Sequence, residues 1–144
     1  MTGDHGSDQT VHASAVALDG RCVLIFGPSG SGKSALALGL MAIGCALVSD
    51  DYTMVCARDD LLWAKAPDAI RNRIEARGVG ILAAEAVQGA RVVLAVELGV
   101  TEADRLPPER QRTICGQTVP LLHNIAAPHF PAAILQYLKA GRVA

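Results

Sequence analysis

Residues 27–34 constrain the fold of this chain more than any other segment does. They are Gly27, Pro28, Ser29, Gly30, Ser31, Gly32, Lys33 and Ser34, and they match the phosphate-binding pattern G-x-x-x-x-G-K-[ST]. An apolar run over residues 22–26 precedes them and predicts a buried strand, and the residues from Ser34 onward predict a helix. Glycines let such a loop wrap closely around phosphate oxygens at a helix N-terminus, where free N–H groups favour anions. The order strand, loop and helix therefore predicts an α/β domain that binds a nucleoside triphosphate.

Two side chains of this loop have specific expected roles. Lys33 would reach the β- and γ-phosphates, and the Ser34 hydroxyl would bind Mg²⁺. The alternative interpretation is a Gly- and Ser-rich turn that joins a strand to a helix and binds nothing. Such a turn does not need Gly-Lys-Ser at the helix start together with spaced glycines. ATP with Mg²⁺ is therefore the expected ligand.

The composition argues against several other classes of function. Hydrophobic residues make up 51% of the 144 residues and charged residues 19%, which is typical of a globular domain. The formal net charge is −1, no run of Lys and Arg occurs, and aromatic residues make up only 3%, which argues against nucleic-acid binding. The longest apolar run, residues 35–48, is short and interrupted by Gly39 and Gly44, so no membrane span is expected.

The cysteines and the N-terminal residues favour a cytoplasmic location. Four cysteines occur without any C-x-x-C pair and with mostly apolar neighbours, which predicts buried free thiols and no zinc site: Cys22, Cys45, Cys56 and Cys115. Residues 1–9 are polar and show no signal peptide. We expect residues 1–9 to form a flexible tail and residues 10–144 to form a single domain.

Turn chemistry predicts where His12 lies. Asp19-Gly20 between two strand-like runs is a strong signal for a two-residue hairpin turn. With Leu18 paired to Arg21, His12 faces Gly27 across the hairpin, beside the phosphate-binding loop. This register also gives the strand before the loop an antiparallel neighbour, as in a mixed sheet. The alternative for His12 is a histidine that is either hydrogen-bonded within the fold or exposed to solvent and has no chemical role.

The rest of the pattern predicts the elements around the loop. We expect a helix over residues 32–43 and a C-terminal helix over residues 131–140, which begins at a proline and ends before a glycine. Strands are expected over residues 10–18, 46–49 and 91–98, with a hairpin formed by residues 52–57 and 61–64. Residues 101–117 are charged and contain two consecutive prolines, so we expect a loop there.

Asp50 and Asp51 are the first candidates for the chemistry beside the loop. They close a strand that follows the loop helix, and strand C-terminal ends line the ligand crevice of open α/β folds. Because adjacent strand residues face opposite ways, one aspartate could hold Mg²⁺ while the other accepts a proton from an attacking hydroxyl. His12 near Asp51 could orient that carboxylate or exchange protons with it. The alternative is a solvated Asp-Asp turn.

Residues 75–80 are the next candidate. Glu75 could complete the metal shell, and Arg77 could neutralise phosphate charge. The alternative is a helix end followed by a glycine-containing turn.

These residues together resemble the catalytic domain of HPr kinase/phosphorylase, the bacterial enzyme that phosphorylates a serine of a phosphocarrier protein. The resemblance extends from about Val11 to about Ala140 and is specific at three places. The first is Val11-His12 followed by the hairpin and the loop, and the second is the strand that ends in Asp50-Asp51. The third is residues 74–81, which are similar to the Glu-Ile-Arg-Gly signature of the family, with Ala76 in place of Ile.

The resemblance implies a fold, a site and partners. The fold would be a P-loop domain of the HPr kinase and phosphoenolpyruvate carboxykinase-like type, with a mixed sheet and a P-loop helix. The implied partner is an HPr-type phosphocarrier protein of the phosphotransferase system, and related proteins form hexamers. The implied catalytic residues are Asp51 as the proton acceptor, His12, Lys33 and, by a looser alignment, Arg105, and the implied Mg²⁺ ligands are Ser34 and Glu75, with Asp50 as a further candidate.

Two departures from the family pattern affect which domains and which activity we expect. Full-length members carry an additional N-terminal domain, for which the residues before Val11 leave no room, so a short form is expected. The Arg- and Gly-rich segment that the family uses for dephosphorylation is replaced by residues 116–124, which favours kinase activity over phosphorylase activity. Two alternatives stay open: a P-loop kinase for a small molecule, and a nucleotide-binding regulator that transfers no phosphoryl group.

Overall fold

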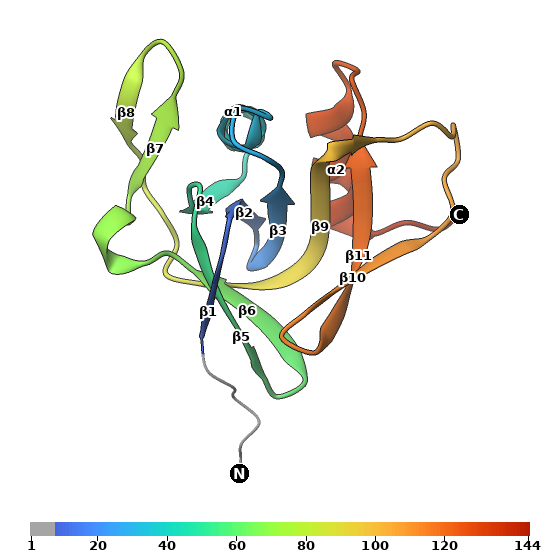
Figure 1. The fold of residues 1–144 in the computed structure, drawn as a ribbon, viewed down its shortest axis with the longest axis horizontal. Helices are drawn as coiled ribbons and strands as arrows, with labels where there is room; N and C mark the ends of the chain where they lie inside the picture. Colours follow the sequence, from blue (N-terminus) through green and yellow to red (C-terminus); the bar gives the residue numbers. More distant parts are fainter. Residues whose placement is uncertain (1–7) are drawn as a thin grey trace.

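The computed structural model describes residues 8–144, which form a large sheet, a two-stranded sheet, two α-helices and a short 3-10 helix. The strands are β1 (Gln9–Val11), β2 (Ala13–Leu18), β3 (Arg21–Phe26), β4 (Ala46–Ser49), β5 (Thr53–Arg58), β6 (Leu61–Lys65), β7 (Arg73–Ala76), β8 (Gly80–Ala83), β9 (Ala90–Thr101), β10 (Arg110–Ile114) and β11 (Gln117–Asn124). The α-helices are α1 (Lys33–Ala42) and α2 (Phe130–Ala140), and a short 3-10 helix, η2 (Asp68–Ile70), precedes β7. Figure 1 shows α1 between the β7–β8 hairpin and α2, and α1 contacts both.

The large sheet is mixed. Its strand order is β1-β5-β6-β9-β3-β2-β4, with β11 bonded to β9 and β10 bonded to β11. Strand β3 runs antiparallel to β2 and parallel to β9, and α1 follows it directly after the loop. Strand β9 pairs with β3 along one edge and with β6 and then β11 along the other. The expected α/β fold with a mixed sheet and a P-loop helix is therefore confirmed.

The β2–β3 hairpin has the register that its turn residues predict. Leu18 pairs with Arg21, and the ladder continues to Ala13 and Phe26. Asp19 and Gly20 have φ values of 51° and 80°, which two-residue hairpin turns of this kind require at both central positions. The strand expected over residues 10–18 is interrupted at His12, which lies between β1 and β2. His12 therefore comes directly after the edge strand β1 and directly before the central strand β2.

Side chains on the two faces of β2, β3 and β9 enter two different clusters. The cluster on the helix side buries Val16, Val23, Ile25, Ala37, Leu40, Leu94, Val96, Ile134 and Leu138, among others. The cluster on the other face holds the alternate residues of these strands and is completed by β5, β6, β10 and β11: Ala15, Ala17, Cys22, Leu24, Val55, Leu62, Ala95, Ile114 and Val119, among others. Because both faces are covered, the strand before the loop is a continuous apolar run without alternation.

All four cysteines are free thiols. Cys22 and Cys45 are buried as expected, and burial raises the pKa of both thiols, so they stay protonated. Cys56 and Cys115 are only half-buried. Within residues 8–144, no group of three His, Cys, Asp or Glu side chains has a metal-binding arrangement, and no helix is long and apolar enough to cross a membrane.

Two segment predictions need correction. Residues 101–117, expected to be a loop, contain β10, which forms a hairpin with β11 through a turn at Cys115 and Gly116. The residues before Gly78, for which a helix end was the alternative, form strand β7, which pairs with β8. Of the expected tail, residues 1–7 lie outside the described residues and Gln9 belongs to β1.

Glu102 ties the end of β9 to the β10–β11 hairpin. The Arg110 guanidinium donates to both carboxylate oxygens of Glu102, each at 3.1 Å, and His123 Nδ1 lies 3.9 Å from Oε1. The Glu102 backbone N–H also donates to Asn124 O at 2.9 Å. Hydrogen bonds from Arg110 hold the pKa of Glu102 below its usual range.

We expect Glu102→Gln to make the stability of the fold less dependent on pH in the acid range. A carboxyl whose pKa is lower in the folded state stabilises the fold above its unfolded pKa of about 4.3, and this contribution is lost as the pH falls through the folded pKa. The variant should therefore have a lower Tm than the wild type at pH 7, and the difference should shrink below about pH 4. Thermal unfolding across this pH range measures it, with exposed Glu109→Gln as the control. A Tm difference that is the same at both pH values would contradict the assignment.

Candidate active site

The phosphate-binding loop runs from the end of β3 to the start of α1 with a conformation that requires its glycines. Gly30 and Gly32 have φ values of 82° and 100°, in the left-handed region that other residues rarely adopt. At Gly27 the constraint is space, because an added Cβ would overlap the Ser31 hydroxyl. The loop therefore curls tightly at the N-terminus of α1, as binding of phosphate to backbone N–H groups requires.

Two polar groups in this loop show that it fits an anion. The buried Ser31 Oγ has no hydrogen-bond partner among the described residues. Lys33, which is 5% exposed, donates from Nζ to the carbonyl oxygens of Gly27 at 2.9 Å and Pro28 at 3.2 Å. A buried hydroxyl without a partner, and a buried ammonium whose hydrogen bonds go to neutral carbonyls, are both better satisfied by a phosphate. The loop residues therefore fit the triphosphate of ATP.

Asp50 accepts hydrogen bonds from three elements around the end of β4. Its Oδ1 accepts from Ser34 Oγ at 2.6 Å and from Ser14 Oγ at 3.0 Å, and its Oδ2 accepts from the Glu75 N–H at 2.9 Å. The side chain is 9% exposed, so these three donors replace water around the carboxylate. Asp50 and Ser34 together form an oxygen pair of the kind that Mg²⁺ prefers, beside the loop.

Asp51 faces a different set of groups. Its Oδ1 lies 2.8 Å from His12 Nε2 and 4.0 Å from Lys33 Nζ, and about half of its side chain is exposed. Its φ of 66° is unusual for a residue other than glycine. The two adjacent aspartates thus have separate partners, which is what the sequence predicts for a metal ligand beside a proton acceptor.

His12 is held on two sides. One side is the Asp51 carboxylate, and on the other the ring stacks on Tyr52, with centroids 5.1 Å apart and an interplanar angle of 25°. His12 also lines a hollow of about 360 Å³ together with Gly27 and Pro28, as the hairpin register predicts. The hollow is completed by Val11, Phe26, Glu97 and Arg112.

The main cleft beside the loop has a volume of about 570 Å³. It brings together Ser34, Asp50 and Asp51 with Glu75 and Arg77 from the β7–β8 hairpin. The loop side of the lining consists of Ser29, Gly30, Gly32, Lys33, Ala35 and Leu38. A nucleotide bound to the loop would therefore lie in the same cleft as both candidate aspartates and the hairpin.

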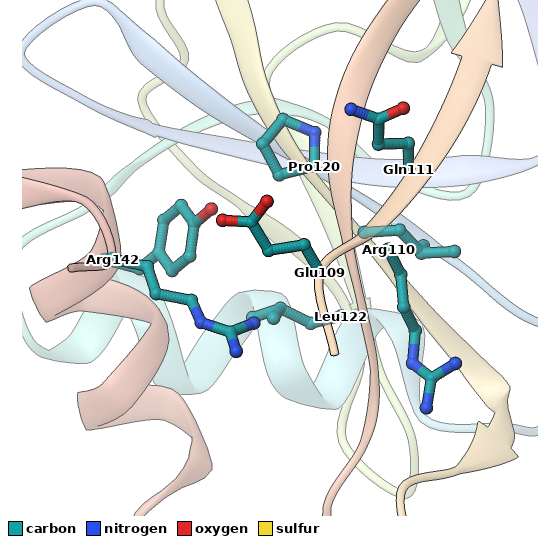
Figure 2. Close-up of a pocket in the computed structure, with 8 residues that line it drawn as sticks. Glu109, Arg110, Gln111, Pro120, Leu122 and Arg142 are labelled. Carbon is teal, nitrogen blue, oxygen red and sulfur yellow. The ribbon is translucent and has the colours of Figure 1, made fainter. Parts of the chain in front are cut away.

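A smaller hollow of about 130 Å³ lies elsewhere, between α2 and the β10–β11 hairpin (Figure 2). Figure 2 shows Arg142 extending toward Glu109, whereas the guanidinium of Arg110 points away from Arg142. Arg142 donates to Pro107 O and so joins the end of α2 to the loop between β9 and β10. None of the expected site residues lines this hollow.

Comparison with known proteins identifies the family. The model of the HPr Serine kinase C-terminal domain family matches residues 5–100. The chain belongs to this family. An HPr kinase/phosphorylase of Mycoplasmopsis pulmonis is 40% identical over 84 residues, which are 58% of this chain and 27% of the relative. The homologue of Peptoclostridium acidaminophilum is 45% identical over 75 residues, 51% of this chain and 24% of the relative. The chain therefore spans about a quarter of the length of these curated relatives.

A solved structure of this family has the same fold. The structure of the HPr(Ser) kinase/phosphatase from Coxiella burnetii superposes with a TM-score of 0.74 at 26% sequence identity. The match covers 91% of this chain and 94% of that chain. The expected family and fold are therefore both confirmed, and the similarity at the level of structure extends well beyond residue 100.

Arg105 stands apart from the other expected site residues. It is exposed on the loop that follows β9, and it lies neither in the cleft nor in the hollow beside His12. It also lies beyond the residues that the family model matches. In Figure 1 this loop extends away from the β7–β8 hairpin, which carries Glu75. The structure thus brings together the expected residues of the main cleft and His12, but not Arg105.

Two residues with a place in the site were missed by sequence reasoning. Ser14 contacts both aspartates, and Tyr52 stacks on His12. The hairpin register that placed His12 at the loop also places Ser14 nearby, but the contact with Asp50 depends on the pairing of β2 with β4. That pairing joins segments distant in sequence and has no signal in the local pattern.

Proposed function

We propose that this domain transfers the γ-phosphoryl group of ATP to a serine hydroxyl of an HPr-type phosphocarrier protein. One observation supports the proposal most: Asp51 is bonded to His12 and lies 4.0 Å from Lys33 Nζ, while Asp50 is bonded to Ser34. A regulator that only binds nucleotide needs the loop and the metal ligands, but has no use for a second carboxylate at the loop.

The proposed mechanism consists mainly of positioning and charge neutralisation. Backbone N–H groups of residues 29–33 and the Lys33 side chain hold the phosphates, and Arg77, which also lines the cleft, neutralises further phosphate charge. Ser34 and Asp50, with Glu75 at the rim, would hold Mg²⁺, which supplies charge neutralisation between the phosphates. Asp51 takes the proton of the acceptor hydroxyl as the oxygen attacks the γ-phosphorus and the bond to ADP breaks. His12 orients Asp51 through the 2.8 Å contact.

The acceptor is proposed to enter through the hollow that His12 lines. This hollow lies at Gly27 and Pro28, the start of the loop, whereas the main cleft is lined by the loop residues that follow and by the start of α1. An acceptor seated there would meet Asp51 and His12 without displacing the nucleotide. A serine hydroxyl of a protein could reach this open hollow, because His12 is 37% exposed.

The experiment that tests the function is a transfer assay. The protein is incubated with γ-labelled ATP, Mg²⁺ and an HPr-type phosphocarrier, and with the same phosphocarrier after its acceptor serine is changed to alanine. Acid-stable label on the first phosphocarrier only supports the proposal. ATP binding without label on either phosphocarrier would favour a regulatory protein, and label on a small metabolite would favour a small-molecule kinase. Kinase rather than phosphorylase activity and a homo-oligomeric state also stay predictions.

Arg105 is proposed to neutralise charge in the transition state from the loop after β9. Because it lies outside the cleft, this role requires residues 103–106, between the anchored Glu102 and Pro107, to move toward the phosphates when the acceptor binds. We expect Arg105→Ala to lower kcat by about 10³-fold, the effect typical of a transition-state arginine, and to leave the Kd for ATP unchanged. Measurements of transfer rate and nucleotide binding on one preparation test this, and an unchanged kcat would remove Arg105 from the site.

A further inference from the structure

The buried Ser14 hydroxyl joins the two aspartates of the site. Ser14 is 0% exposed, its Oγ donates to Asp50 Oδ1 at 3.0 Å, and the same Oγ accepts the backbone N–H of Asp51 at 3.0 Å. We propose that Ser14 is a positioning residue that holds Asp51 in the orientation needed for proton transfer and keeps Asp50 turned toward Ser34. This inference rests on the proposed function and adds to it a residue that touches no reacting atom.

The chemistry of a hydroxyl suits this place. A serine hydroxyl has one proton to donate and lone pairs to accept with, and here the proton goes to Asp50 and a lone pair takes the N–H of Asp51. Because one hydroxyl makes both hydrogen bonds, the orientation of one bond limits that of the other. The carboxylate of Asp50 and the backbone of Asp51 are therefore coupled. An alanine at this position would leave the Asp51 N–H without this partner.

The backbone of Asp51 needs such support. Its φ of 66° lies in the left-handed region, which aspartate adopts more readily than most residues but less readily than glycine, so a hydrogen bond to its N–H helps to hold this conformation. Ser14 provides a rigid contact because β2 is hydrogen-bonded to β3 on one side and β4 on the other. The pairing of Ala15 with Ser49 brings the next residues, Ser14 and Asp50, beside one another.

Buried polar groups gather at this place. Five polar or charged side chains are buried among the described residues, and all belong to the site or to the turn that carries it: Ser14, Lys33, Ser49, Asp50 and Thr53. Thr53 has a second buried hydroxyl in this region and can be compared directly with Ser14. It is also 0% exposed, and its hydroxyl donates to Ala13 O at 2.8 Å, so it ties the same turn to β2 without touching either carboxylate.

A comparison of Ser14→Ala with Thr53→Val separates positioning from packing. Each variant removes one buried hydroxyl from the same region, but only Ser14→Ala removes a contact with the aspartates. We expect Ser14→Ala to lower kcat for transfer by about 10- to 100-fold, since a small misplacement of a catalytic group has effects of this size, and to leave the KM for ATP at saturating Mg²⁺ unchanged. Thr53→Val should keep kcat near the wild-type value, and Ser14→Thr, which retains the hydroxyl, should regain most of the rate.

Hydrogen exchange of the Asp51 amide tests the same contact without any assay of activity. When exchange is followed by NMR, the Asp51 amide should be protected from exchange in the wild type and in Thr53→Val. It should exchange much faster in Ser14→Ala. Equal loss of kcat in Thr53→Val, or unchanged protection of Asp51 in Ser14→Ala, would overturn the proposal. A folded Ser14→Thr variant that lacks both rate and protection would also overturn it. If the wild type transfers no phosphoryl group, the exchange result still decides whether Ser14 holds Asp51.

Discussion

Asp51→Asn is expected to reduce phosphoryl transfer by about 10²- to 10⁴-fold, the usual contribution of a general base. The amide keeps the shape of the side chain but cannot take the proton of the acceptor hydroxyl. Nucleotide binding should be nearly unaffected, because Asp51 is about half exposed, lies 4.0 Å from Lys33 Nζ and has no contact with Ser34. Rates at saturating ATP and acceptor, together with the Kd for ATP, measure the two effects separately.

The matched control for this variant is Asp60→Asn, which makes the same chemical change at a residue of similar φ in the exposed turn between β5 and β6. It should have the kcat of the wild type. Transfer by Asp51→Asn at the wild-type rate would show that Asp51 is not the proton acceptor. A large rise in the Kd for ATP would instead show that Asp51 acts in nucleotide binding.

Asp50→Asn is expected to lower the free energy of unfolding and to weaken Mg²⁺-dependent nucleotide binding. Asp50 accepts three hydrogen bonds, and an amide group would either point its N–H donor at the Glu75 N–H or take the acceptor away from the Ser14 and Ser34 hydroxyls. An unsatisfied buried polar group of this kind costs about 1–3 kcal/mol of unfolding free energy. The Mg²⁺ concentration needed for half-maximal nucleotide binding should rise by about 10- to 100-fold, as for other changes around a bound metal ion.

Denaturant unfolding and Mg²⁺ titrations of fluorescent-nucleotide binding measure the two parts of this prediction. The contrast with Asp51→Asn is the informative result, since the account assigns metal binding to one aspartate and proton transfer to its neighbour. Identical behaviour of the two variants, with similar losses of rate and Mg²⁺ affinity, would contradict the separate roles.

Sequence reasoning could predict the parts of the site that depend on local chemistry. The phosphate-binding loop is a contiguous motif, and the Asp19-Gly20 turn determines the register that brings His12 to Gly27. Asp50 and Asp51 are recognisable because they end the strand after the loop helix. Each of these inferences needs only neighbouring residues or a single hairpin.

The parts that could not be predicted depend on packing or on unusual turn residues. The hairpin of β10 and β11 was missed because Arg110 and Arg112 make β10 look like a charged loop, yet Arg110 binds Glu102 and Arg112 lies over the Phe26 ring. Its turn uses Cys115 at a φ of 50°, and cysteine is not a usual turn residue. Ser14 and Tyr52 join the site only through contacts with other elements.

The most direct test of the account is a single-turnover experiment with the wild-type protein. The protein is loaded with γ-labelled ATP and Mg²⁺, free nucleotide is removed, and the HPr-type phosphocarrier is added before rapid acid quenching. The account predicts that the label moves from ATP to a serine of the phosphocarrier within one turnover. Label that stays on ATP, in protein that holds ATP tightly, would contradict phosphoryl transfer and identify the domain as a nucleotide-dependent regulator.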